Sequence, residues 1–318
     1  MRKLAIAVLC LFFPALAAAQ AWPSKPIKVI VPFPAGGGTD FIGRLAAKQL
    51  GDRLGQTVYV ENRGGANGGI GVQAVAQAEP DGYTLGAISD TPITVNPALY
   101  PKLAYEPLRD LAPVALINRF PSMLVAHPSV PVKSVAELIA LARAKPGTLN
   151  YSSGGIGNFS HLGLELLGMK AGIKLVHVPY RGVGPATAAV VAGDVQLMYN
   201  NVATALEYVR AGKLTAIAVG EPRRLPALPD IPAIAETVPG FEQSAWVGVF
   251  APVKTPRDIV ARVSREVAAL LKDPEVTRIF ADQQIVAAYE DSDEFARHIR
   301  RETDNWAGVI KTLGIKAE

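Results

Sequence analysis

Three stretches of this sequence place glycines where a short β-branched run gives way to a longer amphipathic segment. They are VPFPAGGGTDF (residues 31–41), SSGGIGNFSH (residues 152–161) and PYRGVGP (residues 179–185). Glycine lets backbone N–H groups approach a ligand closely, and the first turn of a helix carries unpaired N–H groups and a partial positive charge. Junctions of this kind are typical of sites that bind an anion through the backbone.

The residues beside the glycines favour a carboxylate over a phosphate. The first two stretches contain no Lys or Arg and offer the hydroxyls of Thr39, Ser152, Ser153 and Ser160 instead. Phosphates are commonly clamped by cations, whereas neutral donors and helix ends suffice for a carboxylate. Asp40 is either the N-cap of the following helix or a residue that shapes the loop. The alternative for each stretch is that its glycines only make a tight turn.

Motifs of common catalytic and metal sites are missing. The four histidines form no HExxH pair, and neither a GxxxxGK[ST] phosphate loop nor a G-x-S-x-G motif occurs. Ser160 and His161 are neighbours in the chain, so on a helix they point apart and cannot act as a nucleophile and its base. We therefore predict a non-enzymatic protein with no metal and no cofactor.

One glycine motif supports a different function. Residues 69–74 read GIGVQA, which matches G-x-G-x-x-A, follows a predicted strand and opens a predicted helix, with Asp90 about 20 residues further on. This is the outline of a nicotinamide dinucleotide site, so a nicotinamide-dependent enzyme is the alternative hypothesis. Against it, residues 62–68 separate the strand from the glycines, where a dinucleotide site needs a tight turn.

The order of the predicted elements indicates an α/β fold. Short strands alternate with helices, which is typical of mostly parallel sheets covered by helices on both faces. The predicted strands are residues 28–32, 57–61, 83–88, 122–126, 149–152, 174–178, 195–199, 215–219 and 247–251. The predicted helices are residues 40–54, 69–78, 134–144, 160–171, 185–192, 203–211, 256–271, 274–283 and 292–313.

Two interruptions of this pattern predict a division into two lobes. Asn118, Arg119 and Pro121 break the apolar run at residues 117–122, and Pro239 and Gly240 stand in residues 238–246. A middle block inserted into a split outer block can hinge at its two crossovers. We predict that residues 22–120 and 246–318 form lobe 1 and residues 121–245 form lobe 2. Trp246, at the second crossover, is a hinge, site or core residue.

The first 21 residues read as a cleaved secretory signal peptide. Arg2 and Lys3 precede an apolar run at residues 4–16, and small residues follow, with A-x-A sites ending at Ala19 and Ala21. The only cysteine, Cys10, lies in this segment, so the mature chain is expected to form no disulfide. We predict a periplasmic protein. The net charge of +4 comes with no basic cluster interleaved with aromatics, so no nucleic-acid partner is expected.

Five motifs, in order, resemble one family. They are WPSKPIKVIVPFPAGGGTD, VENRGGANGGIGVQAVAQAEPDGYTL, LNYSSGGIGNFSHLGLELL, VPYRGVGPATAAVVAGDVQLMYNN and RAGKLTAIAV. They resemble the substrate-binding proteins of tripartite tricarboxylate transporters, also called the Bug family, from Trp22 to the C-terminus. The resemblance implies a two-lobed periplasmic binding protein of the type II class. It also implies a small carboxylate ligand, such as a di- or tricarboxylate, an aromatic acid or an acidic amino acid, bound between the lobes.

The resemblance also implies partners and site residues. The partners would be the ligand and either the membrane subunits of a transporter or a sensor domain, and the chain is predicted to be a monomer. Asn158 and Asn200 depart from the residues common in the family, serine and an acidic residue, so the ligand cannot be carried over from a relative. The predicted ligand-binding residues are Phe33, Pro34, Ala35, Gly36, Gly37, Gly38, Thr39, Asp40, Ser89, Thr91, Ser152, Ser153, Gly154, Gly157, Asn158, Ser160, His161, Tyr180, Arg181, Gly182, Pro185, Ala186 and Asn200.

Overall fold

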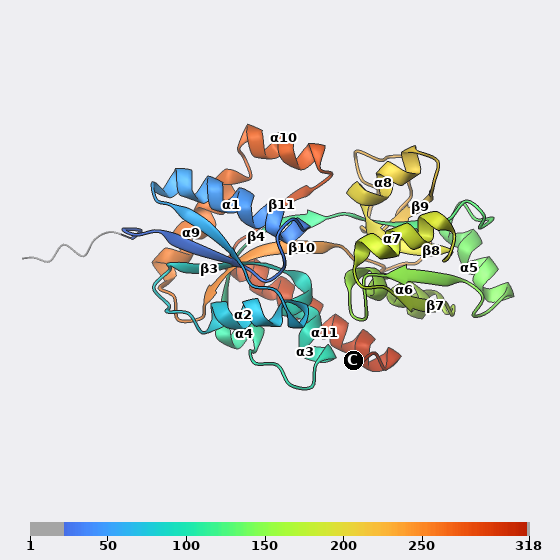
Figure 1. Ribbon diagram of the computed structural model, residues 1–318, viewed down its shortest axis with the longest axis horizontal. Helices are drawn as coiled ribbons and strands as arrows, with labels where there is room; N and C mark the ends of the chain where they lie inside the picture. The colour runs from blue at the N-terminus through green and yellow to red at the C-terminus, as the bar shows by residue number, and fades with distance from the viewer. Residues whose placement is uncertain (1–21, 317–318) are drawn as a thin grey trace, which may run out of the picture.

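Two separate β-sheets, each flanked by helices, make up the computed structural model, which describes residues 22–316 (Figure 1). The predicted signal peptide therefore lies outside the described residues. The two-lobed α/β fold expected from the sequence is confirmed. Both sheets are mixed rather than mostly parallel, because β4, β5 and β10, which join the lobes, pair antiparallel with their neighbours.

The sheet of lobe 1 has six strands in the order β11-β4-β10-β3-β1-β2. Helices α1 and α9 contribute apolar side chains to the core on one face, and α2 and α11 cover the other. The strands are β1 (Ile27–Val31), β2 (Val58–Asn62), β3 (Thr84–Ser89), β4 (Leu111–Phe120), β10 (Ala245–Pro252) and β11 (Val286–Glu290). The helices are α1 (Gly38–Leu54), α2 (Gly69–Ala76), α3 (Asn96–Leu99), α4 (Pro107–Asp110), α9 (Arg257–Leu270), α10 (Pro274–Asp282) and α11 (Ser292–Leu313), with short turns η1 (Ala66–Gly68) and η2 (Thr91–Val95).

The sheet of lobe 2 has five strands in the order β7-β6-β8-β5-β9. Helices α5 and α6 pack on one face and α7 and α8 on the other. The strands are β5 (Ser122–Ala126), β6 (Asn150–Ser153), β7 (Val176–Pro179), β8 (Leu197–Asn201) and β9 (Thr215–Val219). The helices are α5 (Val135–Ala144), α6 (Phe159–Ala171), α7 (Val183–Ala192) and α8 (Val202–Arg210), with the short turn η3 (Ile234–Glu236).

Strands β4 and β11 were missing from the sequence prediction. Strand β4 was missed because Pro113 and the polar residues Asn118 and Arg119 interrupt its apolar run. Asn118 is nevertheless fully buried in the sheet. Strand β11 is an edge strand paired only with β4, and Val286 and Tyr289 are exposed. An edge strand does not need the apolar run by which a central strand is recognised.

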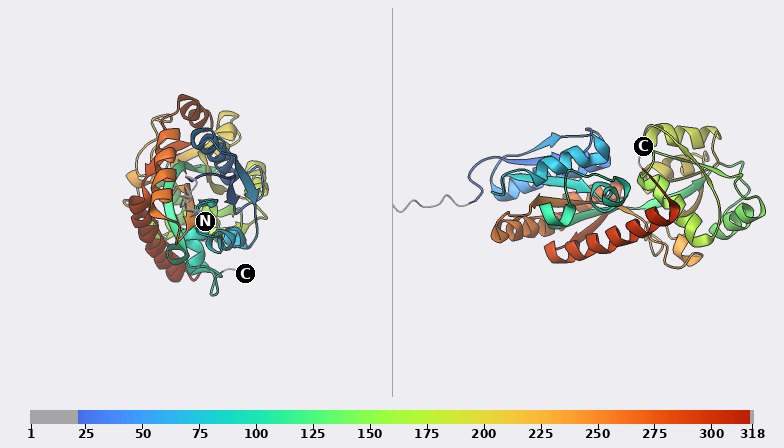
Figure 2. Two further views of the ribbon diagram at one scale, coloured as in Figure 1. Left: turned by 90° about the vertical axis from the view of Figure 1, so that its left-hand side faces the viewer. Right: turned by 90° about the horizontal axis from the view of Figure 1, so that it is seen from below.

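Three segments connect the lobes. The first is the passage from β4 to β5 through Pro121, and the second is the approach to β10 through Gln243 and Ser244. The third is α11, which begins under lobe 1 and ends under lobe 2 (Figure 2). Phe295 and Ile299 of α11 lie in the lobe 1 core, whereas its last turns belong to the main apolar cluster of lobe 2. The sequence prediction had assigned residues 246–318 as a whole to lobe 1.

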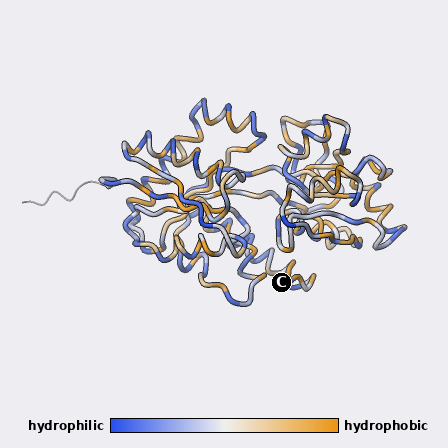
Figure 3. Tube along the Cα trace, in the orientation of Figure 1, coloured by the Kyte–Doolittle hydropathy of each residue, from blue (hydrophilic) through white to orange (hydrophobic). Residues whose placement is uncertain are grey.

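Apolar residues gather on the strands and on the inner faces of the helices (Figure 3). Within residues 22–316, none of the helices has the length and apolar character needed to cross a membrane. Trp246 is fully buried in the core of lobe 1, where it stacks with Phe250 and meets Phe295 edge to face. It is therefore a core aromatic, and its indole N–H also donates to Glu302.

Candidate functional site

The predicted loops lie at the edges by which the two sheets face each other. In lobe 1 the carboxyl ends of β1, β3 and β4 share one edge, because β10 runs antiparallel to both β3 and β4. Strand β4 leaves this edge and enters lobe 2 as β5, beside the carboxyl ends of β6 and β8. The 33–40 loop after β1 therefore lies on one side of the division between the lobes. The loops after β6 and β7 lie on the other side (Figure 1).

Asp40 shapes the 33–40 loop from within the first turn of α1. Its carboxylate accepts hydrogen bonds from the Gly36 N–H (2.9 Å), from Arg44 Nε (2.9 Å) and from Asn62 Nδ2 (2.8 Å). Asn62 Nδ2 also donates to the Phe33 carbonyl at 3.0 Å. Burial alone would raise the pKa of Asp40, but these hydrogen bonds lower it to about 2. Asp40 is not the N-cap of α1: that position belongs to Gly37, and the loop-shaping role is the one observed.

The N-terminus of α1 is open. Gly37 provides no side-chain cap, and a Cβ on it would meet only the Pro34 carbonyl, at 4.0 Å. Residues 34–38 are exposed, and the N–H groups of Gly38, Thr39 and Asp40 have no acceptor within residues 22–316. Gly37 has φ −85°, so it does not need the left-handed region. Its lack of a side chain matters because it keeps the approach to these donors clear.

We expect Asp40→Ala to lower the free energy of unfolding by about 2 kcal/mol, because the Gly36 N–H and the Asn62 amide lose their acceptor. Chemical denaturation of the variant measures this loss. Arg44→Ala is the matched control, since the Arg44 side chain is 54% exposed and its ion pair with Asp40 contributes less than about 1 kcal/mol. Equal losses in both variants would contradict the loop-shaping role.

The serine hydroxyls of lobe 2 are used within the 153–160 loop. Ser152 Oγ donates to the Ala186 carbonyl (2.9 Å), and Ser153 Oγ bonds His177 Nε2 (2.5 Å). Ser160 Oγ donates to Asn158 Oδ1 (2.7 Å) and accepts the Gly154 N–H (3.0 Å). All three serines are fully buried. In this structure their hydroxyls are therefore engaged within lobe 2, where they position the loop.

The N-terminus of α6, unlike that of α1, carries a side-chain cap. Asn158 is its N-cap, and its side-chain oxygen accepts the Ser160 N–H at 3.0 Å. His161 is buried beside His177, with ring centroids 4.0 Å apart, and its Nδ1 accepts the Gly157 N–H at 3.1 Å. Burial and the His177 ring lower the pKa of His161 to about 3, so it is a neutral acceptor inside the lobe.

Helix α7 carries the open N-terminus of lobe 2. Its N-cap is Gly182, at φ +115°, with no side-chain cap and open space around its Cβ position. Arg181 precedes it, exposed and without an ion-pair partner in the described part of the chain. A Cβ on Gly154 would lie 3.1 Å from the Val183 nitrogen, which places the 153–160 loop directly beside this helix end. Pro185 is exposed in the first turn and cannot donate.

The remaining predicted residues differ in accessibility. Asn200 is fully buried, donates to Thr187 Oγ1 at 3.0 Å and accepts the Asn201 N–H. Ala186 is also fully buried. Ser89 ends β3 and is 9% exposed, and Thr91 begins η2 half-buried. Asn200 and Ala186 therefore support lobe 2, and Ser89 and Thr91 stand at the lobe 1 edge.

Two residues of this arrangement were missed in the sequence prediction, Asn62 and Arg44, which hold Asp40 in place. Asn62 stands at the carboxyl end of β2, which is the edge that carries the 33–40 loop. The sequence contained this signal in the motif VENRGG, but the strand pairing was needed to use it.

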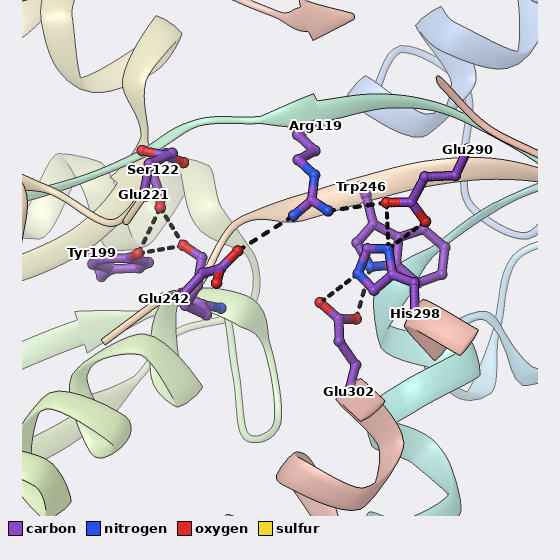
Figure 4. A network of polar contacts seen from close by, with 10 residues as sticks. Arg119, Ser122, Tyr199, Glu221, Glu242, Trp246, Glu290, His298 and Glu302 are labelled. Carbon is purple, nitrogen blue, oxygen red and sulfur yellow. Dashed lines mark hydrogen bonds and ion pairs between the residues drawn. The ribbon is translucent and has the colours of Figure 1, made fainter. Parts of the chain in front are cut away.

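A charged network occupies the hinge (Figure 4). Arg119 at the end of β4 pairs with Glu290 (3.3 Å) and with Glu242 of the second connection (3.6 Å). His298 lies between Glu290 (2.9 Å) and Glu302 (3.3 Å). Burial lowers the pKa of His298, but its hydrogen bonds to the two carboxylates raise it to about 9. His298 is therefore a cation at neutral pH.

The raised pKa of His298 predicts a loss of stability in alkali. A base whose pKa rises from 6.5 unfolded to about 9 folded contributes stability that is complete below pH 6.5 and lost as the pH passes 9. Burial and the neighbouring Glu302 raise the pKa of Asp90 to about 8, which acts in the same direction. From pH 7 to pH 10 we expect the free energy of unfolding to fall by about 3 kcal/mol from His298 alone. Denaturation curves at each pH check this, and His298→Gln should flatten the profile.

A cavity of about 630 Å³ lies behind the hinge, and none of the predicted ligand-binding residues lines it. Lobe 1 contributes Asp90 and Arg119 to its wall, lobe 2 contributes Met169 and Lys170, and α11 contributes Trp306. The three glycine stretches predicted from the sequence as the site are separate from this cavity. Within residues 22–316, no group of acidic, His or Cys side chains is arranged to hold a metal ion.

The G-x-G-x-x-A stretch forms the start of α2. Residues 63–68, which include the turn η1, separate it from β2. A Cβ on Gly71 would lie 2.6 Å from the Arg63 carbonyl and from Pro32 Cα. Gly71 therefore serves the close packing of α2 against the two loops. The tight strand-to-helix turn of a dinucleotide site does not form here.

Comparisons with known proteins agree with this architecture. Residues 42–315 match the sequence profile of the family described as tripartite tricarboxylate transporter family receptor. Protein BugT of Bordetella pertussis is 36% identical over 300 residues, which cover 94% of this chain and 92% of BugT. The structure of Rpa4515 from R. palustris with adipate is 34% identical, with a TM-score of 0.82 and coverage of 93% of this chain and 100% of that one.

A second solved structure, MatC from Rhodopseudomonas palustris with bound malate, is 33% identical, with a TM-score of 0.77 and coverage of 91% of this chain and 100% of that one. The match to the family model extends over most of the chain, and the two-lobed architecture is shared. The resemblance found in the sequence motifs is confirmed: this chain belongs to the tripartite tricarboxylate transporter receptor family of solute-binding proteins.

Proposed function

We propose that this protein captures a small dicarboxylate in the periplasm, with one carboxylate at the N-terminus of α1 and the other at the N-terminus of α7. The observation that carries the proposal is the pair of glycine N-caps, Gly37 and Gly182. Each leaves its helix end without a side-chain cap, in open space, and they belong to facing edges of opposite lobes. Open helix N-termini attract anions through free N–H groups and the helix dipole.

The chemistry beside the two helix ends differs. The 33–40 loop offers only neutral donors, whereas Arg181 stands next to Gly182 and adds a full positive charge at the lobe 2 end. A charged donor strengthens a hydrogen bond to a carboxylate. The solved relatives bind adipate and malate, both dicarboxylates, which supports a ligand with an acid group at each end.

A ligand held by both lobes favours their closure. It gains its full set of hydrogen bonds only when α1 and α7 approach one another, so it binds the closed form more tightly and shifts the population toward it. Within residues 22–316, no hydrogen bond or ion pair joins the 33–40 loop to the 153–160 loop or to Arg181.

Titration calorimetry and small-angle scattering test the proposal. Adipate and malate serve as the probes, and binding of either should lower the radius of gyration. Acid that is recovered unchanged after incubation excludes turnover. Product formation by the protein alone, or tight binding of NADH, would instead favour the nicotinamide-dependent enzyme. Binding that leaves the radius unchanged would contradict capture between two lobes.

We further propose that the loaded protein delivers its ligand to the membrane subunits of a tripartite tricarboxylate transporter, with a sensor domain as the other candidate partner. The family to which the chain belongs is one of transporter receptors, which supports the first partner. Uptake of labelled ligand into cells that lack and regain this protein distinguishes the two: a sensor partner leaves uptake unchanged and alters gene expression instead.

The N-terminal pattern gives a separate prediction about location. Protein recovered from the periplasm should begin near Gln20 or Trp22 and contain no cysteine, because residues 1–21 read as a signal peptide. Intact mass spectrometry of the secreted protein measures this. A mass that includes residues 1–19, or a lipid on Cys10, is incompatible with the prediction.

A further inference from the structure

Leu99 of α3, a lobe 1 residue that the sequence did not single out, lies against the 153–160 loop of lobe 2. A Cβ built on Gly157 would overlap Leu99 Cδ2, so Leu99 lies against the bare backbone of this glycine. Leu99 is 3% exposed and belongs to the same apolar cluster as Phe159 and Leu162 of lobe 2. Trp306 and Val309 of α11 join that cluster from below.

Helix α3 is fixed within lobe 1. Asn96, at its first position, is fully buried, accepts a hydrogen bond from Asn67 Nδ2 (3.0 Å) and donates to the Asn67 carbonyl (3.2 Å). Tyr105 adds a hydrogen bond from its hydroxyl to the Pro92 carbonyl at 2.6 Å. With only four residues, α3 has little stability of its own, so these contacts hold it.

The anchor of α3 leads to the 33–40 loop. Asn67 is followed by Gly68, where a Cβ would lie 3.1 Å from Phe33 Cζ and 3.2 Å from Pro92 Cγ. A Cβ on Gly64 would lie 3.2 Å from Pro34 Cδ. The segment that holds α3 is therefore the one on which the 33–40 loop rests. On the other side of the division, the Gly157 N–H is held by His161 inside lobe 2.

We propose that Leu99 is a positioning residue that sets the placement of the 153–160 loop of lobe 2 relative to the 33–40 loop of lobe 1. The contact of Leu99 with Gly157 is a pivot below the division between the lobes, opposite the two β connections. Gly157 has φ +74°, which favours glycine, and its bare backbone also lets Leu99 approach this closely. In this proposal the lobes rotate about this buried apolar contact, in which Leu99 is 3% exposed.

The pivot is tested first without any ligand, by the distance between spin labels on the two lobes. Lys213→Cys in lobe 2 and Lys254→Cys in lobe 1 are exposed label positions, and Cys10→Ser leaves no other cysteine in the full chain. Gly157→Ala adds a methyl group that overlaps Leu99, so the interlobe distance should increase or its distribution broaden. In the double variant Leu99→Ala/Gly157→Ala the overlapping side chain is removed. The distribution of interlobe distances should then return toward that of the parent.

Gly147→Ala is the matched control. Gly147 lies in lobe 2 at φ +72°, close to the φ of +74° at Gly157, but nothing lies within 4 Å of its Cβ position, so it carries the same backbone strain without the overlap. Equal distributions for Gly147→Ala and Gly157→Ala, or no return in the double variant, would overturn the pivot. If Gly157→Ala does not fold, Leu99→Ala alone decides: a distribution as narrow as that of the parent overturns the proposal.

A second measurement links the pivot to ligand capture and rests on the proposed function. Leu99→Ala should weaken adipate or malate binding several-fold, mainly by slowing association, because fewer molecules hold the two loops at the right separation. A purely structural role would lower the melting temperature and leave the association rate unchanged. If neither acid binds the parent protein, the proposed ligand class fails while the distance measurement still judges the pivot.

Discussion

Gly220→Ala is expected to destabilise the protein by about 3 kcal/mol or more, the largest effect of a single methyl group that this structure predicts. A Cβ on Gly220 would overlap both the Tyr199 hydroxyl and Ser122 Oγ. Both side chains are fully buried, 2.6 Å apart, and each is 2.6 Å from the Gln243 carbonyl. The methyl group must break at least one of these buried hydrogen bonds, in addition to the cost of overpacking.

Ser122, Tyr199 and Gln243 lie where the lobes are joined, so breaking their hydrogen bonds should affect more than the local packing. Ser122 begins β5 just after the first connection between the lobes, and Gln243 belongs to the second. Tyr199 on β8 therefore ties the two connections together inside lobe 2. We expect Gly220→Ala to loosen the hinge as well as to unfold lobe 2 more readily.

Thermal unfolding followed by circular dichroism measures the effect, and a loss of about 3 kcal/mol corresponds to a fall of about 5 °C in the melting temperature for a chain of this size. Gly308→Ala is the control, because Gly308 lies within α11 and a Cβ there meets nothing within 4 Å. Alanine at such a helical position stabilises by up to about 1 kcal/mol. A melting temperature for Gly220→Ala equal to that of the parent would contradict the predicted overlap.

Blocking either open helix end should weaken ligand binding at least tenfold, or by about 1.4 kcal/mol or more. In Gly37→Val the backbone can keep its extended φ of −85°, so the added side chain only covers the N–H groups of α1. In Gly182→Val the side chain covers the start of α7 and also disfavours the observed φ of +115°. Each variant removes the donors of one lobe, and the pair together should abolish measurable binding.

Calorimetry with adipate and malate on variants shown to be folded decides this prediction. Gly55→Val is the control for the strained backbone, because Gly55 ends α1 at φ +67°, in open space and far from its N-terminus. It should lower stability and leave affinity unchanged. Unchanged affinity in Gly37→Val would remove α1 from the site, and unchanged affinity in Gly182→Val would leave lobe 2 without a carboxylate donor.

The sequence by itself determined the features that depend on neighbours along the chain. Alternating β-branched and amphipathic runs predicted nine of the strands within a few residues, together with the two-lobed order. The glycine stretches that precede α1 and α7 were recognisable because the end of a strand and the start of the next helix are close in sequence, but Gly37 and Gly182 were not assigned as the N-caps. Motif order was sufficient to identify the family.

Only the tertiary structure decided how the polar side chains are used. Ser152, Ser153 and Ser160 looked like ligand donors, but their partners are Ala186, His177 and Asn158 within lobe 2. A buried hydroxyl must find a partner inside the protein, and that partner can lie far along the chain, so the choice cannot be read from local pattern. The same reason explains why the link between Asn62 and Asp40, 22 residues apart, was missed.

The connections between the lobes also depended on tertiary packing. The amphipathic pattern of α11 shows that one face is buried, but not that Phe295 enters lobe 1 while Trp306 enters lobe 2. Periodicity gives the direction of an apolar face, whereas the element that covers it is set by chain crossings over long sequence separations. The approach of Leu99 to Gly157, 58 residues further along the chain, is of the same kind, since a glycine in a turn and a glycine beneath a side chain look alike in sequence.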